Sequence, residues 1–484
     1  MLLKKLLTHL HHIHTIGSQE GSFDSVTHDS RCSTPSSIFV AIRGDKVDGR
    51  RFAPTISAAA VIADAPTQVP EGTLLIMVEN ARLALAQACA LLYRVPSRDM
   101  FVIGLTGTNG KSTTACILEY IFHSNHIKTG LIGTIGHRFC TQPISTQDGR
   151  TTPEASTVQP LLSEWKDNGA QVVIMEVSSI GLAWHRVDGI YFSCAMFTNF
   201  SRDHLDFHDS MEDYLQAKRR LFTDLVDAQS TCILNHSDLA CRQTPTKGTK
   251  WLFSGSDSSG DLFIEDCHVS LDGTSFVVHT PKGSCTITYP LIGSHNIDNV
   301  LCAIGGALSY GLSLSAIQHA LSSLPPVPGR LERARGSIPV FIDYAHSPDA
   351  LSHILQTLRP LCAGKLITVF GCGGDRDKGK RPIMGRIAQQ HSDICVVTSD
   401  NPRSEHPQHI ISDILEGMTG TPTTFVDRKE AISFAIATAT KDDVVVIAGK
   451  GHECYQEIQG VQHPFDDKII AQELLSSFGD HHEI

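Results

Sequence analysis

The segment that most constrains this chain is residues 101–113, which read FVIGLTGTNGKST. An apolar strand is expected at residues 101–105, followed by a glycine-rich turn and a helix from about Ser112. Gly107 and Gly110 allow the backbone to curl until successive N–H groups point at one anion, and the helix N-terminus adds partial positive charge. Lys111 can reach the β- and γ-phosphates of a nucleotide, and the Ser112 hydroxyl can bind Mg²⁺. The segment therefore predicts a nucleotide-binding loop in an α/β domain.

The strict form of this loop has glycine at the position that Leu105 occupies here. The match is instead to the shorter form TGTNGKST. The loop alone does not distinguish a motor protein, a kinase and a ligase.

Composition narrows the class of protein. A chain of 484 residues corresponds to about three domains at ~150 residues each. Its 40 Lys and Arg against 51 Asp and Glu give a net charge of −11, which argues against a nucleic-acid or anionic-membrane partner. The 14 cysteines form no C-x-x-C pair, and no uncharged apolar stretch reaches the ~20 residues of a spanning helix. We expect a cytoplasmic protein with reduced thiols.

The chain divides into three segments, which we predict to be domains spanning residues 1–97, 98–328 and 329–484. In the middle segment, strands expected at 172–177, 194–199 and 231–234 alternate with helices, which is typical of a doubly wound parallel sheet. A proline-rich stretch at 324–330 resembles a linker. Strands expected at 340–343, 365–370, 394–398 and 444–448 indicate a second α/β domain.

Three side chains of the middle segment could bind a cation. Glu176 ends a predicted strand, where α/β sheets bind ligands, so it could hold Mg²⁺ or simply cap the following turn. His204 or Asp206 could bind a second cation, although a histidine in isolation is more often an ordinary polar residue. Lys218 lies on an amphipathic helix, and a free ammonium with a pKa of ~10.4 cannot bind Mg²⁺.

The ordered set of motifs resembles the Mur ligases of bacterial cell-wall synthesis. These motifs are TGTNGKST, EVSS, NFSRDHLDFH, YLQAKRRLF, GSHNIDN (293–299), PGRLE (328–332), DYAHSPD (343–349), GGDRDKGKRP (373–382), DNPR (400–403) and GKGHE (449–453). In the first segment, HDSR (28–31), FVAIRG (39–44) and DGRRF (48–52) resemble the uridine-nucleotide domain of the members that add a diamino acid. The resemblance covers essentially the whole chain.

The resemblance implies an α/β fold of three domains, in which a central P-loop domain is flanked by a uridine-nucleotide domain and a C-terminal Rossmann-like domain. It implies an ATP-dependent ligase, expected to be a monomer, that adds meso-diaminopimelate to UDP-N-acetylmuramoyl-L-alanyl-D-glutamate through an acyl phosphate. An L-lysine-adding Mur ligase and a folylpolyglutamate synthetase-like ligase are the alternatives. A P-loop ATPase that switches a protein partner would leave the motifs of the third segment unexplained.

The resemblance also assigns residues. ATP would contact Gly107, Thr108, Asn109, Gly110, Lys111, Ser112, Thr113, Asn296, Arg330 and Asp343. The catalytic set would be Lys111, Glu176, His204 and Lys218. Ser112 and Glu176 would share one Mg²⁺. His204 and Lys218 would hold a second, with Lys218 carbamylated by CO₂ so that an anionic oxygen replaces the ammonium. The UDP-linked substrate would bind Ser30, Thr151, Thr152, Ser178 and Arg186. The amino acid would bind Arg376, Asp400, Asn401, Pro402, Arg403, Gly449 and Glu453.

Diaminopimelate differs from lysine by one carboxylate, which a guanidinium binds bidentately, so the resemblance makes Arg403 the specificity element. Lysine-adding relatives lack this arginine. The chain departs from its relatives at two positions, since Ile180 and Trp184 replace the usual histidine and glutamine of EVSSHGL and QHR. Trp184 could replace the glutamine contact to the sugar nucleotide only by packing on an apolar part of it.

Overall fold

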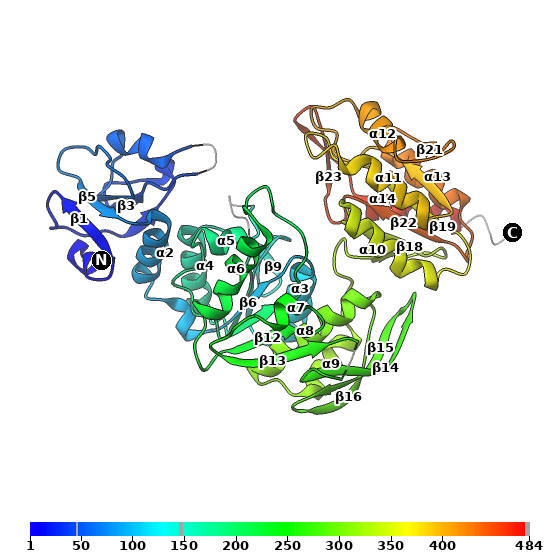
Figure 1. Cartoon of the computed structure of the whole chain (residues 1–484), viewed down its shortest axis with the longest axis horizontal. Helices are drawn as coiled ribbons and strands as arrows, with labels where there is room; N and C mark the ends of the chain where they lie inside the picture. Colours follow the sequence, from blue (N-terminus) through cyan, green and yellow to red (C-terminus); the bar gives the residue numbers. More distant parts are fainter. Residues whose placement is uncertain (45–46, 145–148, 257, 480–484) are drawn as a thin grey trace. The chain divides into compact units, whose positions relative to one another are not determined.

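The computed structural model describes residues 1–44, 47–144, 149–256 and 258–479 (Figure 1), and every site residue proposed above lies among them. The described residues form two compact units. The first comprises residues 1–265, 278–285 and 298–320, and the second comprises residues 266–277, 286–297 and 321–484. The mixed α/β class expected from the sequence is confirmed, whereas the three domain boundaries stay predictions.

The first unit begins with a sheet in the order β1-β5-β4-β3-β2. Its strands are β1 (His12–Ile16), β2 (Ser25–Thr27), β3 (Ser37–Val40), β4 (Ala60–Ala63) and β5 (Leu74–Val78). β1 is antiparallel to β5, and the other pairs are parallel. Helices α1 (Leu3–Leu7) and α2 (Ala81–Leu92) contribute to the same core. The Asn80 side chain caps α2 by accepting hydrogen bonds from the N–H groups of Arg82 and Leu83.

Another sheet carries the nucleotide-binding loop, in the order β16-β15-β14-β13-β12-β11-β6-β10-β7-β8-β9. Strands β6 to β13 belong to the first unit, whereas parts of β14, β15 and β16 belong to the second. Strand β6 (Phe101–Thr106) lies between β10 (Val172–Glu176) and β11 (Cys194–Phe197), parallel to both. The other strands are β7 (Thr129–Ile132), β8 (His137–Phe139), β9 (Gln142–Ile144), β12 (Thr231–Asn235), β13 (Thr249–Ser254), β14 (Leu262–Ser270), β15 (Gly273–Thr280) and β16 (Gly283–Tyr289). The middle of this sheet is parallel, as predicted.

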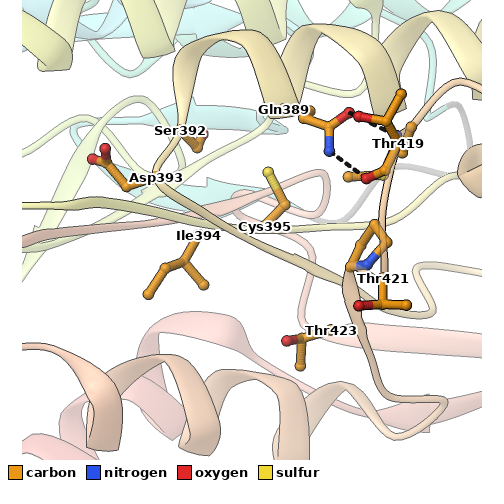
Figure 2. Close-up of a pocket in the computed structure, with 10 residues that line it drawn as sticks. Gln389, Ser392, Asp393, Ile394, Cys395, Thr419, Thr421 and Thr423 are labelled. Carbon is orange, nitrogen blue, oxygen red and sulfur yellow. Dashed lines mark hydrogen bonds between the residues drawn. The ribbon is translucent and has the colours of Figure 1, made fainter.

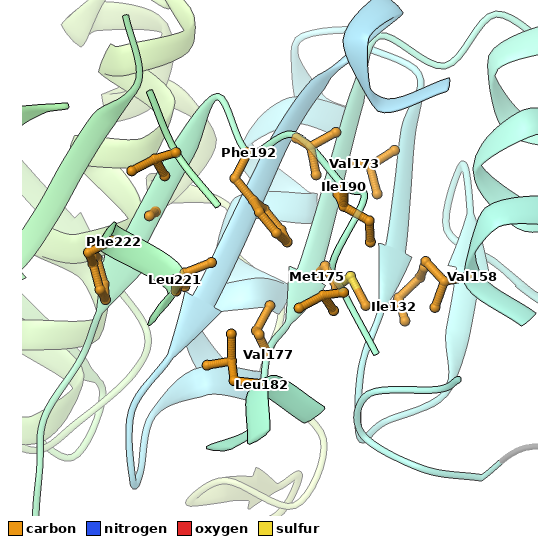
Figure 3. Packing of buried hydrophobic residues seen from close by; sticks show 14 of the residues in the cluster. Ile132, Val158, Val173, Met175, Val177, Leu182, Ile190, Phe192, Leu221 and Phe222 are labelled. Atoms are coloured by element: carbon orange, nitrogen blue, oxygen red, sulfur yellow. The ribbon is translucent and has the colours of Figure 1, made fainter. Parts of the chain in front are cut away.

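Helices connect many of these strands: α3 (Lys111–Ser124), α4 (Ala155–Asp167), α5 (Ser179–Ala183), α6 (Met211–Thr223) and α7 (Leu239–Arg242). Two further helices, α8 (Ser294–Tyr310) and α9 (Leu314–Ser322), follow β16. Figure 3 shows a core that α4, α5 and α6 share with the sheet, where Met175, Phe192 and Leu221 pack around β6. A Cβ atom at Gly104 in the middle of β6 would lie 2.7 Å from the Phe192 ring. Glycine at this position therefore allows Phe192 to close over the strand.

The second unit contains a sheet in the order β17-β18-β22-β19-β20-β21. Its strands are β17 (Glu332–Ala334), β18 (Val340–Asp343), β19 (Leu366–Phe370), β20 (Ile394–Val397), β21 (Thr423–Thr424) and β22 (Val444–Ala448). β17 is antiparallel to β18, and the remaining pairs are parallel. The four strands predicted for this segment are therefore confirmed to within a residue or two at each end.

Helices cover both faces of this sheet, because alternate residues of its strands belong to two different hydrophobic cores. Phe341, Val444 and Val446 belong to a core with α10 (Pro348–Leu358), α11 (Lys380–His391) and α12 (Pro407–Leu415). Ile342 and Val445 belong to a second core with α13 (Arg428–Thr438) and α14 (Asp467–Gly479). Because side chains alternate between the two faces of a strand, this segregation makes the unit doubly wound. A hairpin of β23 (Tyr455–Ile458) and β24 (Val461–Pro464) follows β22.

A fully buried ion pair fixes the carboxyl ends of two strands of this sheet. Arg428 donates to both carboxylate oxygens of Asp467 at 2.8 Å, and both side chains are 0% exposed. Arg428 also donates to the carbonyl oxygens of Ser399 and Ala448. Asp400 directly follows Ser399, and Gly449 directly follows Ala448, so these hydrogen bonds also fix the positions of Asp400 and Gly449.

None of the helices formed by the described residues combines the length and apolarity that crossing a lipid bilayer requires.

We expect Asp467→Asn to lower the free energy of unfolding by about 3 kcal/mol, because it leaves the Arg428 charge buried without its counter-ion. Urea denaturation followed by fluorescence measures the loss. The control is Asp272→Asn, which breaks the pair between Arg333 and an 87% exposed carboxylate and should change the midpoint little. Equal losses in the two variants would contradict the role of the buried pair.

Candidate active site

The predicted strand, turn and helix around the phosphate-binding loop are confirmed. β6 ends at Thr106, and α3 begins at Lys111 directly after Gly110. Gly107 and Gly110 have positive φ angles of 149° and 84°. A Cβ atom at Gly107 would collide with the Thr198 hydroxyl, and one at Gly110 with the Asn299 side chain. Both positions therefore require glycine for space as well as for backbone conformation.

Contacts from the next strand's end shape the rest of the loop. The N–H of Asn109 donates to the Asn199 side chain at 2.9 Å, and the N–H of Thr108 donates to the Asn199 carbonyl oxygen at 2.9 Å. The Thr108 hydroxyl lies 3.1 Å from the Tyr214 hydroxyl, and Thr113 is buried in the first turn of α3. The loop is thus held in a fixed curve.

The Lys111 side chain folds over this curve. Its ammonium donates to the carbonyl oxygens of Gly107 at 2.8 Å and Thr108 at 2.9 Å. A cation in this position can move to the oxygens of a bound phosphate chain, which carry more negative charge than a carbonyl group.

Ser112 and Glu176, the predicted pair for the first Mg²⁺, are in direct contact. The Ser112 hydroxyl donates to a Glu176 carboxylate oxygen at 2.9 Å, and Glu176 is buried at the end of β10. Hydroxyl and carboxylate oxygens are ligands that Mg²⁺ prefers, so this pair fits the cation.

Sequence reasoning missed Thr134 at this site. Its N–H donates to one Glu176 oxygen at 2.9 Å and its hydroxyl to the other at 3.1 Å, which fixes the carboxylate. A Cβ atom at Gly133 would collide with Glu176, so that glycine permits the approach. The signal was available, because Thr134 lies two residues after the end of β7, the parallel neighbour of β10.

Lys218 is not the solvated lysine that its helix position alone suggests. It is 1% exposed, and its amino group donates to the Gly107 carbonyl oxygen at 2.8 Å and lies 4.6 Å from the centre of the Tyr214 ring. Burial and the nearby Lys111 charge lower the pKa of Lys218 well below its usual range. The two lysines donate to the same carbonyl oxygen, which places Lys218 at the phosphate-binding loop.

His204 also lies beside Tyr214, with 5.9 Å between the ring centres. Burial lowers the pKa of His204, and the charges of Lys111 and Lys218 lower it further, which favours the neutral imidazole that binds metals. The structure therefore brings His204 and Lys218 to the same tyrosine. Asp206, the alternative ligand, has an exposed side chain.

Most of the residues expected to hold the UDP-linked substrate are hydrogen-bonded to one another. The Thr152 hydroxyl donates to Ser178 Oγ at 3.1 Å and to the Glu176 carbonyl oxygen at 2.9 Å. Arg186 donates to the Thr152 carbonyl oxygen at 2.9 Å, and the Thr151 hydroxyl lies 2.9 Å from that of Thr134. These contacts form a continuous chain to Glu176.

Ser30 is the exception. It begins a short 3₁₀ helix, η1 (Ser30–Cys32), and none of the hydrogen bonds among the described residues joins it to the other four. Its contact with the substrate stays a prediction.

Among the predicted ATP residues of the second unit, Asn296 and Asp343 are buried, whereas Arg330 is half-buried. Asp343 accepts hydrogen bonds from the N–H groups of Leu331 at 2.7 Å and Ala345 at 2.8 Å, and burial raises its pKa. The Arg330 guanidinium lies 5.3 Å from the centre of the Tyr344 ring. Asn296 is buried in α8. Contact of these three with a nucleotide stays a prediction.

The residues expected to bind the amino acid follow three neighbouring strands of the second unit: Arg376 follows β19, residues 400–403 follow β20, and Gly449 and Glu453 follow β22. Asp400 is 7% exposed, and its Oδ2 atom has no hydrogen-bond partner among the described residues. Gly449, with φ of 121°, leaves room for that oxygen, because a Cβ atom there would collide with it. A buried, available carboxylate oxygen is suited to a ligand ammonium group.

The Asn401 side chain is hydrogen-bonded within the protein at both its amide oxygen and its amide nitrogen. Its amide oxygen accepts from Lys450 at 2.9 Å and from the N–H of Glu457 at 3.0 Å, and its amide nitrogen donates to Glu453 at 2.8 Å. Lys450 is 0% exposed and was missed from the sequence. Asn401 therefore aligns its neighbours through both ends of its amide.

Arg403 has a positive φ of 53°, held by backbone hydrogen bonds to Glu457 and Gln459 of the hairpin. Its guanidinium donates to the Gly374 carbonyl oxygen at 2.7 Å and pairs with Glu457 at 3.2 Å. Pro402 is buried beside it, whereas Arg376 is exposed. A Cβ atom at Gly373 would lie within 4 Å of both Arg376 and Arg403, so the two arginines flank one surface.

A separate surface pocket, shown in Figure 2, contains none of the predicted residues. It is lined by Gln389, Asp393, Cys395 and Thr423 among others, at the amino end of β20. The predicted amino-acid residues follow the carboxyl ends of β19, β20 and β22, so this pocket at the amino end of β20 is not part of their site.

Comparisons with known proteins agree with the motif order. The model described as Mur ligase middle domain matches residues 105–307, and that described as Mur ligase, glutamate ligase domain matches residues 329–451. The chain is 42% identical over 458 residues to the UDP-N-acetylmuramoyl-L-alanyl-D-glutamate--2,6-diaminopimelate ligase of Gloeobacter violaceus, covering 93% of each chain. It is 39% identical over 488 residues to the protein of the same name from Bacillus licheniformis, covering 98% of this chain and 99% of that one.

Solved structures are similar over nearly the full length. A structure of a UDP-N-acetylmuramoyl-L-alanyl-D-glutamate--2,6-diaminopimelate ligase has a TM-score of 0.73 and 31% identity, covering 100% of this chain and 99% of the other. The MurF ligase of Thermotoga maritima in complex with ADP has a TM-score of 0.62 at 17% identity, covering 94% and 97%, which is a likeness of fold alone.

Lys218→Met is expected to raise the free energy of unfolding at pH 7 by about 1–3 kcal/mol, because an apolar side chain replaces a buried amine. The unfolded lysine binds its proton up to a pH of ~10.4, whereas the folded lysine loses it at lower pH. Wild-type stability therefore rises with pH across this window, and the advantage of the variant shrinks. Urea denaturation between about pH 6.5 and 9.5 in CO₂-free buffer measures how the difference in the free energy of unfolding between the variant and the wild type changes with pH. The exposed Lys247→Met is the control, and a pH-independent difference would contradict the interpretation.

Proposed function

The chain belongs to the Mur ligase family, and we propose that it joins meso-diaminopimelate to UDP-N-acetylmuramoyl-L-alanyl-D-glutamate during synthesis of peptidoglycan precursors. As a member of that family it is an ATP-dependent, amide-forming ligase. The observation that carries the choice of substrates is that relatives matching 93% or more of the chain are named for this reaction.

The reaction requires an activated carboxyl group, because oxide is a poor leaving group in a carboxylate. The D-glutamyl side-chain carboxylate attacks the γ-phosphorus of ATP, and ADP leaves. The neutral amine of diaminopimelate then attacks the acyl carbon, so that a C–N bond forms and the bond between the acyl carbon and the phosphate oxygen breaks. Inorganic phosphate leaves, and the nitrogen releases one proton to solvent. Lys111 and the N–H groups at the start of α3 would stabilise negative charge on the phosphoryl oxygens.

Mg²⁺ would be held by Ser112 and Glu176, whose contact at 2.9 Å supports this role, and it would neutralise phosphate charge when bound. A second Mg²⁺ would be held by His204 and Lys218, the latter as a carbamate. Only a neutral amine adds to CO₂, and the lowered pKa of Lys218 supplies that form. The resulting carbamate would carry negative charge next to Lys111, where an anion is favourable.

The second unit would bind diaminopimelate through opposite charges. The available Asp400 oxygen suits an ammonium group, and Arg403 suits the carboxylate that lysine lacks. We further propose a monomeric enzyme of the cytoplasm. Each of the 14 cysteines is a free thiol among the described residues, which supports a reducing compartment.

We expect phosphate release from ATP when UDP-N-acetylmuramoyl-L-alanyl-D-glutamate and meso-diaminopimelate are both present, and little release when L-lysine replaces diaminopimelate.

Arg403→Met should lower kcat/KM for diaminopimelate by roughly 10- to 100-fold, the range for a hydrogen bond to a charged group. Arg386→Met, an exposed arginine of the same unit, is the control. Equal turnover of both amino acids by the wild-type enzyme would exclude the proposed role of Arg403.

Lys218→Ala should abolish turnover, and tens of millimolar of acetate or propionate, as an order of magnitude, should restore part of it by supplying the missing carboxylate ligand. Lys111→Ala should also be inactive but should not respond to the acids, because its proposed role is cationic. Full activity of Lys218→Ala, or equal rescue of both variants, would contradict the carbamate.

A further inference from the structure

A buried carboxylate in the first unit gathers several arginines. Glu154 directly precedes α4 and has a side chain that is 3% exposed. Its Oε1 atom accepts hydrogen bonds from Arg186 at 2.9 Å, Arg150 at 3.0 Å and Arg82 at 3.3 Å. These residues come from separate parts of the chain, with Arg82 on the first turn of α2 and Arg186 shortly after α5.

The side chains of Arg82 and Arg186 are only 13% and 5% exposed, although both carry a charge. Even with Arg150 left out, two largely buried guanidinium groups share one carboxylate oxygen. Burying a charge is unfavourable unless an opposite charge lies close by. This arrangement therefore favours a further anion, and planar guanidinium groups recognise carboxylate and phosphate oxygens in particular.

Trp184, which replaces the glutamine of the relatives, lies between these arginines. The Arg82 guanidinium carbon is 4.0 Å and that of Arg186 is 4.9 Å from the ring centre, and Phe207 packs edge-on at 5.3 Å. Tryptophan is the strongest aromatic partner for a cation. The Trp184 indole thus packs on both guanidinium groups, and it helps to fix the positions of Arg82 and Arg186.

Other contacts fix the far ends of the two arginines. Arg82 donates to the Arg43 carbonyl oxygen at 2.8 Å, and Arg186 donates to the Thr152 carbonyl oxygen at 2.9 Å. Thr152 in turn hydrogen-bonds Ser178 and the backbone of Glu176. An anion held by the two arginines would therefore lie next to the residues expected to bind the UDP-linked substrate.

We propose that Arg82 joins Arg186 in an arginine clamp that binds an oxyanion of the UDP-linked substrate, with Trp184 and Glu154 as the positioning residues. The identity of the ligand rests on the proposed function. The oxyanion is either the diphosphate or a carboxylate of the peptide, and the tests separate these two sources.

Calorimetric titration in the absence of ATP and amino acid measures binding of UDP-N-acetylmuramoyl-L-alanyl-D-glutamate, UDP-N-acetylmuramate and UDP. Arg82→Met should weaken binding by roughly 10- to 100-fold and reduce its dependence on salt. Weaker binding of all three ligands identifies the diphosphate, and weaker binding of the peptide-bearing ligand alone identifies a carboxylate. Unchanged binding of every ligand would overturn the clamp.

The control is Arg98→Met, which removes another arginine–aromatic contact, 5.2 Å from the Tyr191 ring, and should leave binding unchanged. Trp184→Ala should raise KM for the UDP-linked substrate several-fold with kcat nearly constant, and Trp184→Phe should retain most of the wild-type affinity because it keeps an aromatic face. Equal KM values in wild type and Trp184→Ala would exclude the positioning role.

Thermal denaturation of each variant separates misfolding from loss of the clamp, and Arg82→Lys provides a second substitution that keeps the charge. It should recover only part of the affinity, since an ammonium lacks the planar fork. Failure of the wild-type protein to bind any of the three ligands would count against the proposed function itself. Binding by wild type and Arg82→Met alike would count against the clamp alone.

Discussion

The catalytic end of the first unit depends on one backbone group, the carbonyl of Gly107. It accepts hydrogen bonds from both Lys111 and Lys218, which brings the Lys111 charge close to the buried amine of Lys218. The residue can present this carbonyl because it has no side chain, since a Cβ atom would enter the space of Thr198. The lowered pKa of Lys218 follows from its burial at this loop and from the nearby Lys111 charge.

The carboxyl ends of parallel strands bring the remaining groups to the same place. Glu176 ends β10, Thr134 follows β7, and the Asn199 contacts come from the segment after β11. Because β10 and β11 lie beside β6 and β7 lies beside β10, the side chains meet near the phosphate-binding loop without being near one another in sequence.

The parts of the site that are local in sequence could be predicted, and the parts that depend on pairing across the fold could not. The strand, glycine turn and helix around Lys111 follow from apolar pattern and glycine spacing, and Ser112 and Glu176 follow from their places at a helix start and a strand end. The burial of Lys218 could not be read from its own helix, because Gly107 and Tyr214 create it from other elements. Lys450 and Glu154 were missed for the same reason, since Lys450 contacts Asn401 and Glu154 contacts Arg82 and Arg186, all remote in the chain. Thr134 differs, because its place after β7 was a usable signal.

The hairpin of β23 and β24 determines what would have to be transferred to change the amino-acid preference of such a ligase. Its backbone holds the positive φ of Arg403, its Glu457 pairs with the guanidinium, and its N–H at Glu457 joins Lys450 and Glu453 in securing Asn401. Transplanting DNPR alone into a relative would separate the tetrapeptide from the scaffold that shapes it. The proposed specificity element is therefore the tetrapeptide together with the hairpin that shapes it, two segments separated by about fifty residues.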